Sequence, residues 1–144
     1  MQVVMPTDNI AVPILDAKDV AWAPEKIKDL YQRRKARIHL INVQPIYPQH
    51  IAQFFPRGAL ERIHLEDGMR VLQPVIAELD RAKVPHWDHV LIGLVAERVV
   101  EFVKANYCRE VLLREDGEGR LVFGSVTSQI RKALSDLNDA IPGS

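Results

Sequence analysis

The stretch that decides the fold is residues 86–127, HWDHVLIGLVAERVVEFVKANYCREVLLREDGEGRLVFGSVT. Its first part holds an apolar run at residues 89–92, which is typical of a buried strand and is followed by Gly93. Apolar residues then recur at helical spacing, before a helix terminator at Asn106. This stripe consists of Ala96, Val99, Val100, Val103 and Tyr107. The sequence therefore predicts a strand followed by a helix.

The second part of the same stretch repeats this order. Residues 111–113 form another apolar run, and the polar residues 114–120 follow it. A helix is predicted from about Ser125, because apolar residues again recur on one face. They are Val126, Ile130, Ala133, Leu134 and Leu137.

The residues upstream show the same alternation. Apolar runs at residues 10–15 and 38–43 predict two more strands, and a helix between them has Pro24 in its first turn. The alternation predicts an α/β fold, a three-layer sandwich with a mostly parallel sheet and helices on both faces. A fifth strand is expected after the last helix, but residues 138–144 are too few and too polar to form a full one.

A long connection after residue 43 carries three prolines together with several apolar side chains, and it leads into a helix. These side chains are Ile46, Tyr47, Ile51, Phe54 and Phe55. The favoured interpretation is a flap packed on the following helix, and the alternative is a lid or a protein contact. That helix has an apolar stripe, and Pro74 within it predicts a kink. The stripe consists of Leu65, Met69, Leu72, Ile76 and Leu79.

Composition and charge narrow the class of protein. The 144 residues suit a single domain, with residues 1–9 as a possible N-terminal extension. Nineteen basic and nineteen acidic residues give no net charge, which argues against a nucleic-acid or membrane-surface binder. The single cysteine allows no disulfide within the chain. Without a signal-like start or a long apolar run, the expected location is cytoplasmic.

A candidate anion site lies just before the last helix. Gly117 and Gly119 precede the sequence Gly124-Ser125-Val126-Thr127, which opens that helix. Glycine allows a ligand close to the backbone, and free N–H groups at a helix N-terminus favour a phosphate. The structural alternative is equally simple, because Ser125 is a good helix cap and glycines make tight loops.

Taken together, these segments resemble the universal stress protein family. Residues 86–127 carry most of the likeness, and the strands at residues 10–15 and 38–43 also fit, so that it extends over residues 10–137. The resemblance implies a Rossmann-like fold, a homodimer as the common assembly, and a branch of the family that binds ATP with Mg²⁺.

The same resemblance suggests which residues would hold a nucleotide. Pro13 and Asp16 would correspond to the end of the first strand, with the Asp16 carboxylate meeting the ribose or base. Val43 would offer backbone groups to adenine, and Gly93 would end the third strand. Gly124, Ser125 and Val126 would hold phosphates, with Thr127 adding a hydroxyl. A competing alignment puts Asp8 in place of Asp16, at the cost of a long stretch before the second strand.

Two departures from the family pattern argue against tight binding. Only four residues separate Gly119 from Gly124, so the phosphate loop is shortened. It also carries Glu115, Asp116 and Glu118, which would repel a triphosphate unless Mg²⁺ or Arg120 compensated. The sequence thus favours a stress-response module that acts by association with itself or with a protein partner, with weak or lost ATP binding. The alternative is an ATP-binding member of the family.

Catalysis and metal binding have little support in the sequence. His86 and His89 are three residues apart in a predicted strand, so that they should point to opposite faces. No serine, histidine and aspartate are tied together by spacing. The expectation is a protein without enzymatic activity or a metal site.

Overall fold

The computed structural model describes residues 8–115 and 126–139. The strands are β1 (Asn9–Pro13), β2 (Arg37–Gln44), β3 (His86–Ile92) and β4 (Glu110–Val111). The helices are the short 3₁₀ turn η1 (Ala17–Ala21), α1 (Ala23–Arg34), α2 (Gln49–Ala52), α3 (Ala59–Arg81), α4 (Val95–Ala105) and α5 (Val126–Asp139).

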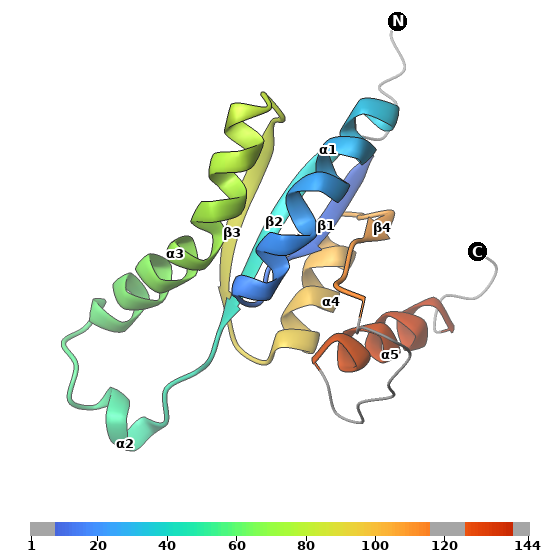
Figure 1. Ribbon diagram of the computed structural model, residues 1–144. Helices are drawn as coiled ribbons and strands as arrows, with labels where there is room; N and C mark the ends of the chain where they lie inside the picture. Colours follow the sequence, from blue (N-terminus) through green and yellow to red (C-terminus); the bar gives the residue numbers. More distant parts are fainter. Residues whose placement is uncertain (1–7, 116–125, 140–144) are drawn as a thin grey trace, which may run out of the picture.

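The four described strands form one parallel sheet in the order β3-β2-β1-β4. Helices α1 and α3 cover one face of the sheet, and α4 and α5 cover the other (Figure 1). The predicted three-layer α/β fold with a parallel sheet is therefore confirmed. Residues 140–144, where a fifth strand was expected to be short or missing, lie outside the described residues.

The core lies on both sides of the two central strands. In β2, Ile38 and Leu40 pack toward α1 and α3, whereas Ile41 and Val43 pack toward α4 and α5. Successive side chains of a strand point to opposite faces, so a strand covered on both sides must be apolar at nearly every position. This explains the almost unbroken apolar run at residues 38–43.

Helix α3 is longer than its apolar stripe predicts. At its start, the buried position also differs by one residue from the predicted stripe. Leu65, expected in the core, is 54% exposed, and His64 is buried instead. Gly68 is also buried, and a Cβ at that position would lie 2.5 Å from Val90 Cγ1. The glycine therefore lets α3 approach β3 closely. Pro74 lies inside the helix, which changes direction along its length (Figure 1).

Residues 45–58, called the arm below, correct the prediction of a packed flap. Tyr47 does pack, because its ring stacks on that of His64 with centroids 5.0 Å apart. Phe54 is 80% exposed and Ile46 68% exposed, so these two apolar side chains of the arm are largely uncovered. The arm carries α2 away from the sheet (Figure 1). The expectation of a flap covered by the kinked helix was wrong for these two side chains.

The ends of β1 decide between the two candidate aspartates. Asp16 follows the carboxyl end of β1, whereas Asp8 precedes the strand. At the start of the strand, the Asp8 carboxylate pairs with Arg34, whose Nη2 lies 2.9 Å from Oδ1. Asp16 is therefore the aspartate at the edge where ligands bind to parallel sheets.

Candidate functional site

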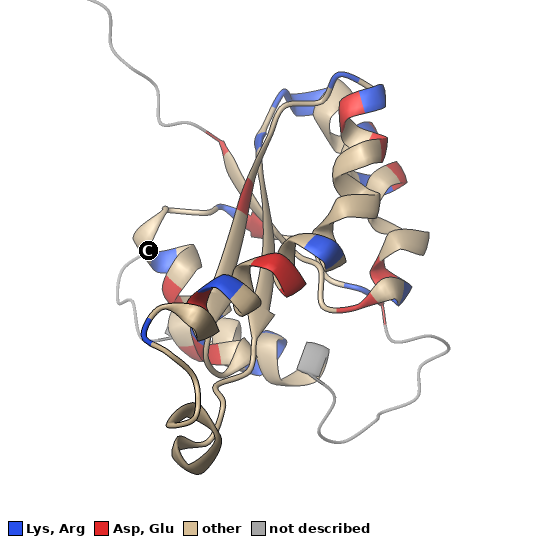
Figure 2. Ribbon diagram, turned by 90° about the vertical axis from the view of Figure 1, so that its left-hand side faces the viewer, with Lys and Arg blue, Asp and Glu red and all other residues tan. Residues whose placement is uncertain are grey.

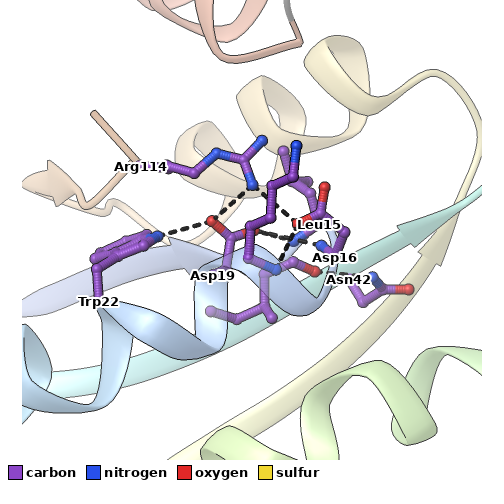
Figure 3. Close-up of polar contacts among 8 residues, drawn as sticks. Leu15, Asp16, Asp19, Trp22, Asn42 and Arg114 are labelled. Atoms are coloured by element: carbon purple, nitrogen blue, oxygen red, sulfur yellow. Dashed lines mark hydrogen bonds and ion pairs between the residues drawn. The ribbon is translucent and has the colours of Figure 1, made fainter. Parts of the chain in front are cut away.

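The carboxyl ends of the parallel strands lie at one edge of the sheet, and the strand order reverses between β1 and β4. Ligands of open α/β folds bind at such a reversal point. The residues that follow these two strands here are Asp16, after β1, and Arg114, after β4. Figure 3 shows that their side chains point toward each other.

The Asp16 carboxylate is already occupied by the protein. Its Oδ1 accepts a hydrogen bond from the Lys18 backbone N–H at 2.9 Å, as the cap of η1, and another from Arg114 Nη1 at 2.9 Å. Burial raises the pKa of Asp16, but these two hydrogen bonds outweigh burial, and the net pKa is below its ordinary value. A ligand hydroxyl at Asp16 would have to compete with Arg114.

Asp19 provides a second, buried carboxylate beside the first. Its side chain is 1% exposed and accepts hydrogen bonds from the Leu15 backbone N–H at 2.7 Å and from Trp22 Nε1 at 2.8 Å. Arg114 Nη1 lies 3.6 Å from Asp19 Oδ1, so that one guanidinium serves two carboxylates. The sequence analysis missed Asp19, Trp22 and Arg114. The spacing of Asp16 and Asp19, which form a capping box, is the signal that could have revealed Asp19.

The backbone beneath this cluster is fixed by β2. Asn42 is 1% exposed, and its Nδ2 donates to the Ile14 carbonyl oxygen at 2.8 Å, while its Oδ1 accepts from Gln44 Nε2 at 2.7 Å. The Ile14 backbone N–H donates to the Ile41 carbonyl oxygen at 2.8 Å. The loop that carries Asp16 is therefore held in place by the end of β2.

A separate cleft of about 490 Å³ opens at the ends of β2 and β3. Its described lining residues are Val43, Pro45, Gly93, Leu94, Val95, Ala96, Glu97 and Gln129. The structure brings Val43 and Gly93 together, whereas Pro13 and Asp16 are absent from this described lining. Gly93 has φ +146°, and a Cβ there would lie 2.8 Å from Arg98 Nε, so only glycine suits the position. Glu97 is the only charged residue in the described lining.

The predicted phosphate-binding residues are largely beyond what the structure describes. Gly117, Gly119, Gly124 and Ser125 lie outside the described residues. Val126 and Thr127 form the first turn of α5, as predicted for a helix starting near Ser125. Their role in holding phosphates stays a prediction.

The histidines form two arrangements on opposite faces of β3, as their spacing predicted. His86 Nδ1 and Nε2 lie 2.7 Å from Asp88 Oδ1 and Asp80 Oδ1, respectively. On the other face, His89 Nε2 lies 3.0 Å from His39 Nδ1, a pair that the sequence analysis missed. Residues 8–115 and 126–139 contain no group of three or more histidine, cysteine or acidic side chains placed to hold a metal ion.

The tautomers of the second arrangement follow from its partners. His39 Nε2 lies 3.0 Å from Asn9 Oδ1, and an amide oxygen only accepts, so this ring nitrogen carries the proton. Nδ1 of a neutral His39 then accepts from His89 Nε2. Burial, together with the neighbouring His89 and Arg37, lowers the pKa of His39 to about 4. All of these hydrogen bonds are made with both rings neutral. They cannot be made with both rings protonated, because His39 Nδ1 and His89 Nε2 would then both carry hydrogen.

Comparisons with known proteins identify the fold. No family model matches the sequence, and no curated protein matches it. A universal stress protein family member from Burkholderia pseudomallei matches with a TM-score of 0.60 at 16% identity, over 88% of this chain and 89% of its own. The chain has the universal stress protein fold.

Two further solved structures agree. A universal stress protein in complex with cAMP has a TM-score of 0.60 at 12% identity, over 90% of this chain and 91% of that one. A universal stress protein from Archaeoglobus fulgidus has a TM-score of 0.57 at 13% identity, over 90% and 92%. The universal stress protein fold thus extends over nearly the whole chain, and the fold implied by the sequence resemblance is confirmed. None of the described helices is long and apolar enough to cross a membrane.

Proposed function

We propose that the chain is a universal stress protein that acts in a stress response as a regulatory or protein-interaction module, with weak or lost binding of ATP. The fold is common to the solved universal stress proteins above, which supports membership of the family. Two separate features at the carboxyl edge of the sheet support the loss of nucleotide binding.

The observation that carries this proposal is the pairing of Asp16 with Arg114. The carboxylate that would meet the ribose already accepts two hydrogen bonds from the protein, both at 2.9 Å. Displacing Arg114 would also remove the cation nearest to the buried Asp19. Leaving the buried Asp19 carboxylate without a nearby cation costs free energy. A nucleotide would have to supply that free energy when it binds.

The charge of the residues that line the cleft beside Val43 and Gly93 does not suit a triphosphate. Its described lining holds no lysine or arginine, and Glu97 contributes a carboxylate. A phosphate placed there would be repelled by that carboxylate unless a cation such as Mg²⁺ lay between them. The same lining is rich in apolar side chains, which suits contact with a protein.

The second candidate is an adenine-nucleotide-binding universal stress protein. The position of the cleft favours it, because Val43 and Gly93 meet at the carboxyl ends of two parallel strands. The volume of about 490 Å³ is within the range of small-molecule sites. The match to a universal stress protein in complex with cAMP is in keeping with this candidate.

Titration calorimetry with Mg-ATP separates the two. The proposal predicts no measurable heat, or a dissociation constant near or above about 1 mM. The Arg114→Ala variant, in which Asp16 is released, serves as the comparison, and it should bind more tightly than the wild type. A wild-type dissociation constant in the low micromolar range would overturn the proposal and establish the second candidate.

A further inference from the structure

A second cavity, called the arm pocket below, lies between the arm and the start of α3. Its volume is about 260 Å³, and its walls include Tyr47 of the arm, His64 of α3 and Ile92 at the end of β3. It shares no described lining residue with the cleft beside Val43 and Gly93. A cavity of about 150 Å³ is already large enough to hold benzene. The arm pocket is therefore a separate site with room for a small molecule.

His64 is a polar group at this pocket that the protein leaves unsatisfied. The residue is only 4% exposed, and no described residue forms a hydrogen bond with its buried Nδ1. Most buried polar groups in proteins have a hydrogen-bond partner, because a buried group without one costs free energy. A histidine in this state at the wall of a cavity points to a polar partner that enters the cavity.

Flat and apolar side chains surround this histidine. The Tyr47 ring stacks on the His64 ring with centroids 5.0 Å apart and planes at 27°, and on the Phe55 ring at 6.4 Å and 21°. Tyr47 and His64 both line the pocket, and Ile92 adds an aliphatic wall. Such walls favour an aromatic ligand, because ring stacking adds to the burial of apolar surface.

The charge of the lining disfavours an anionic ligand. The described lining holds no lysine or arginine, and Glu61 contributes a carboxylate. Glu61 also lies in the first turn of α3, where its carboxylate already meets the positive end of the helix dipole. Figure 2 shows α2 and its neighbouring loops almost free of charged residues. A phosphate or carboxylate group here would be repelled by Glu61, whereas a neutral or cationic group would not.

We propose that the arm pocket binds a small aromatic molecule that carries a hydroxyl or N–H group and no negative charge. Its ring would lie beside Tyr47 and Ile92. Its O–H or N–H would donate to the imidazole of His64, which in the neutral form has one acceptor nitrogen. This site goes beyond the proposed function and does not depend on it. Because Tyr47 belongs to the arm and His64 to α3, the bound molecule would join these two segments.

Phenol is the probe, and two-dimensional NMR of the isotope-labelled protein maps where it binds. Phenol should shift the backbone signals of the arm and of the first turns of α3, with a dissociation constant of about 1 mM, as expected for so small a ligand. The signals of Val95 and Glu97, which line the other cleft, should not move. No shifts at about 20 mM phenol, or shifts centred on Val95 and Glu97, would overturn the inference.

A comparison of phenol with toluene isolates the hydrogen bond, because the two molecules are similar in size and toluene has no polar hydrogen. His64→Phe keeps a ring but removes both nitrogens, so the preference for phenol over toluene should fall about fivefold or more. His50→Phe is the matched control, because His50 is an exposed histidine of the arm outside the described lining, and it should leave the preference unchanged. Equal preferences in the wild type and His64→Phe would overturn the role of His64.

The charge of the ligand is tested with tyramine and hydroxyphenylpropionate, which share the phenol ring and carry opposite charges. Tyramine should bind more tightly, and Glu61→Gln should reduce the difference about threefold. Glu66→Gln is the matched control, because Glu66 is an exposed glutamate of α3 outside the described lining. Tighter binding of hydroxyphenylpropionate to the wild type would overturn the assignment of an uncharged or cationic ligand. These titrations contain no nucleotide, so this inference and the proposed function can fail separately.

Discussion

Arg114 Nη1 lies 2.9 Å from Asp16 Oδ1, and this contact joins the residues that follow β4 and β1, 98 positions apart in the chain. The same nitrogen lies 3.6 Å from Asp19 Oδ1. One guanidinium therefore closes the point of strand reversal and balances the buried carboxylate beneath it. The ion pair is both a tie between two strand ends and an obstacle to a ligand at Asp16.

Replacing Arg114 with alanine should destabilise the fold by about 1–2 kcal/mol, because the buried Asp19 loses its nearest cation. The measurement is urea unfolding at pH 7. Arg33→Ala is the matched control: Arg33 pairs with Asp29, but both side chains are about two-thirds exposed, at 66% and 68%. That variant should lose less than about 0.5 kcal/mol. Equal losses in the two variants would show that Arg114 is an ordinary surface residue.

Gly68→Ala should destabilise the protein, although alanine is the better helix former by about 1 kcal/mol. The added Cβ would lie 2.5 Å from Val90 Cγ1, so α3 and β3 would have to move apart. The expected net loss is about 1–2 kcal/mol in urea unfolding. In a Val90→Ala background the same substitution should be neutral or stabilising. A stabilising Gly68→Ala in the wild type would contradict the close packing of these two elements.

His86 should stabilise the fold at low pH, and this contribution should be lost as the pH rises. Burial lowers the pKa of His86, but the hydrogen bonds to Asp80 and Asp88 outweigh burial and raise it above 6.5. Its contribution is therefore fully present below pH 6.5 and is lost as the pH rises through the folded pKa. His86→Asn should cost more at pH 6 than at pH 9, by about 0.5–1 kcal/mol after solvent screening. A pH-independent difference would contradict the paired imidazolium.

His39 should have the opposite effect, because its contribution to stability should be lost as the pH falls. Its pKa is lowered to about 4, first by burial and then by His89 and Arg37. The neutral ring therefore stabilises the fold above pH 6.5, and this stability is lost as the pH falls from 6.5 toward 4, by roughly 1–3 kcal/mol. His39→Gln should remove that loss, as measured by unfolding at pH 7 and pH 4.5. An NMR titration that gave His39 a pKa near 6.5 would contradict the buried pair.

The sequence predicted the strands and helices well because the apolar pattern directly reflects burial. The run at residues 38–43 is apolar on both faces of the sheet, and α1 begins near Pro24 as the cap rules require. The arm was harder, because apolar residues normally indicate packing. Whether Phe54 is covered depends on where the loop goes, which no local pattern encodes.

The candidate site was only partly predictable, for a similar reason. Asp16 was found because it follows a strand, and Val43 was named only through the family resemblance. Arg114 was read only as part of a polar loop, since its partner at position 16 is distant in sequence. The His39–His89 pair depends on the register of β2 against β3, in which Ile41 pairs with His89. Contacts set by strand register cannot be derived from one strand alone.

The ionisation of Asp16 shows whether its carboxylate is paired with Arg114 or is open to a ligand. A carbon-detected NMR titration of its side-chain carboxyl gives the pKa with and without Mg-ATP. If Arg114 holds the carboxylate, the pKa of Asp16 is below 3.8 in the free protein and does not change when Mg-ATP is added. An ordinary pKa near 3.8, or a clear shift of the Asp16 signal on adding the nucleotide, would contradict it.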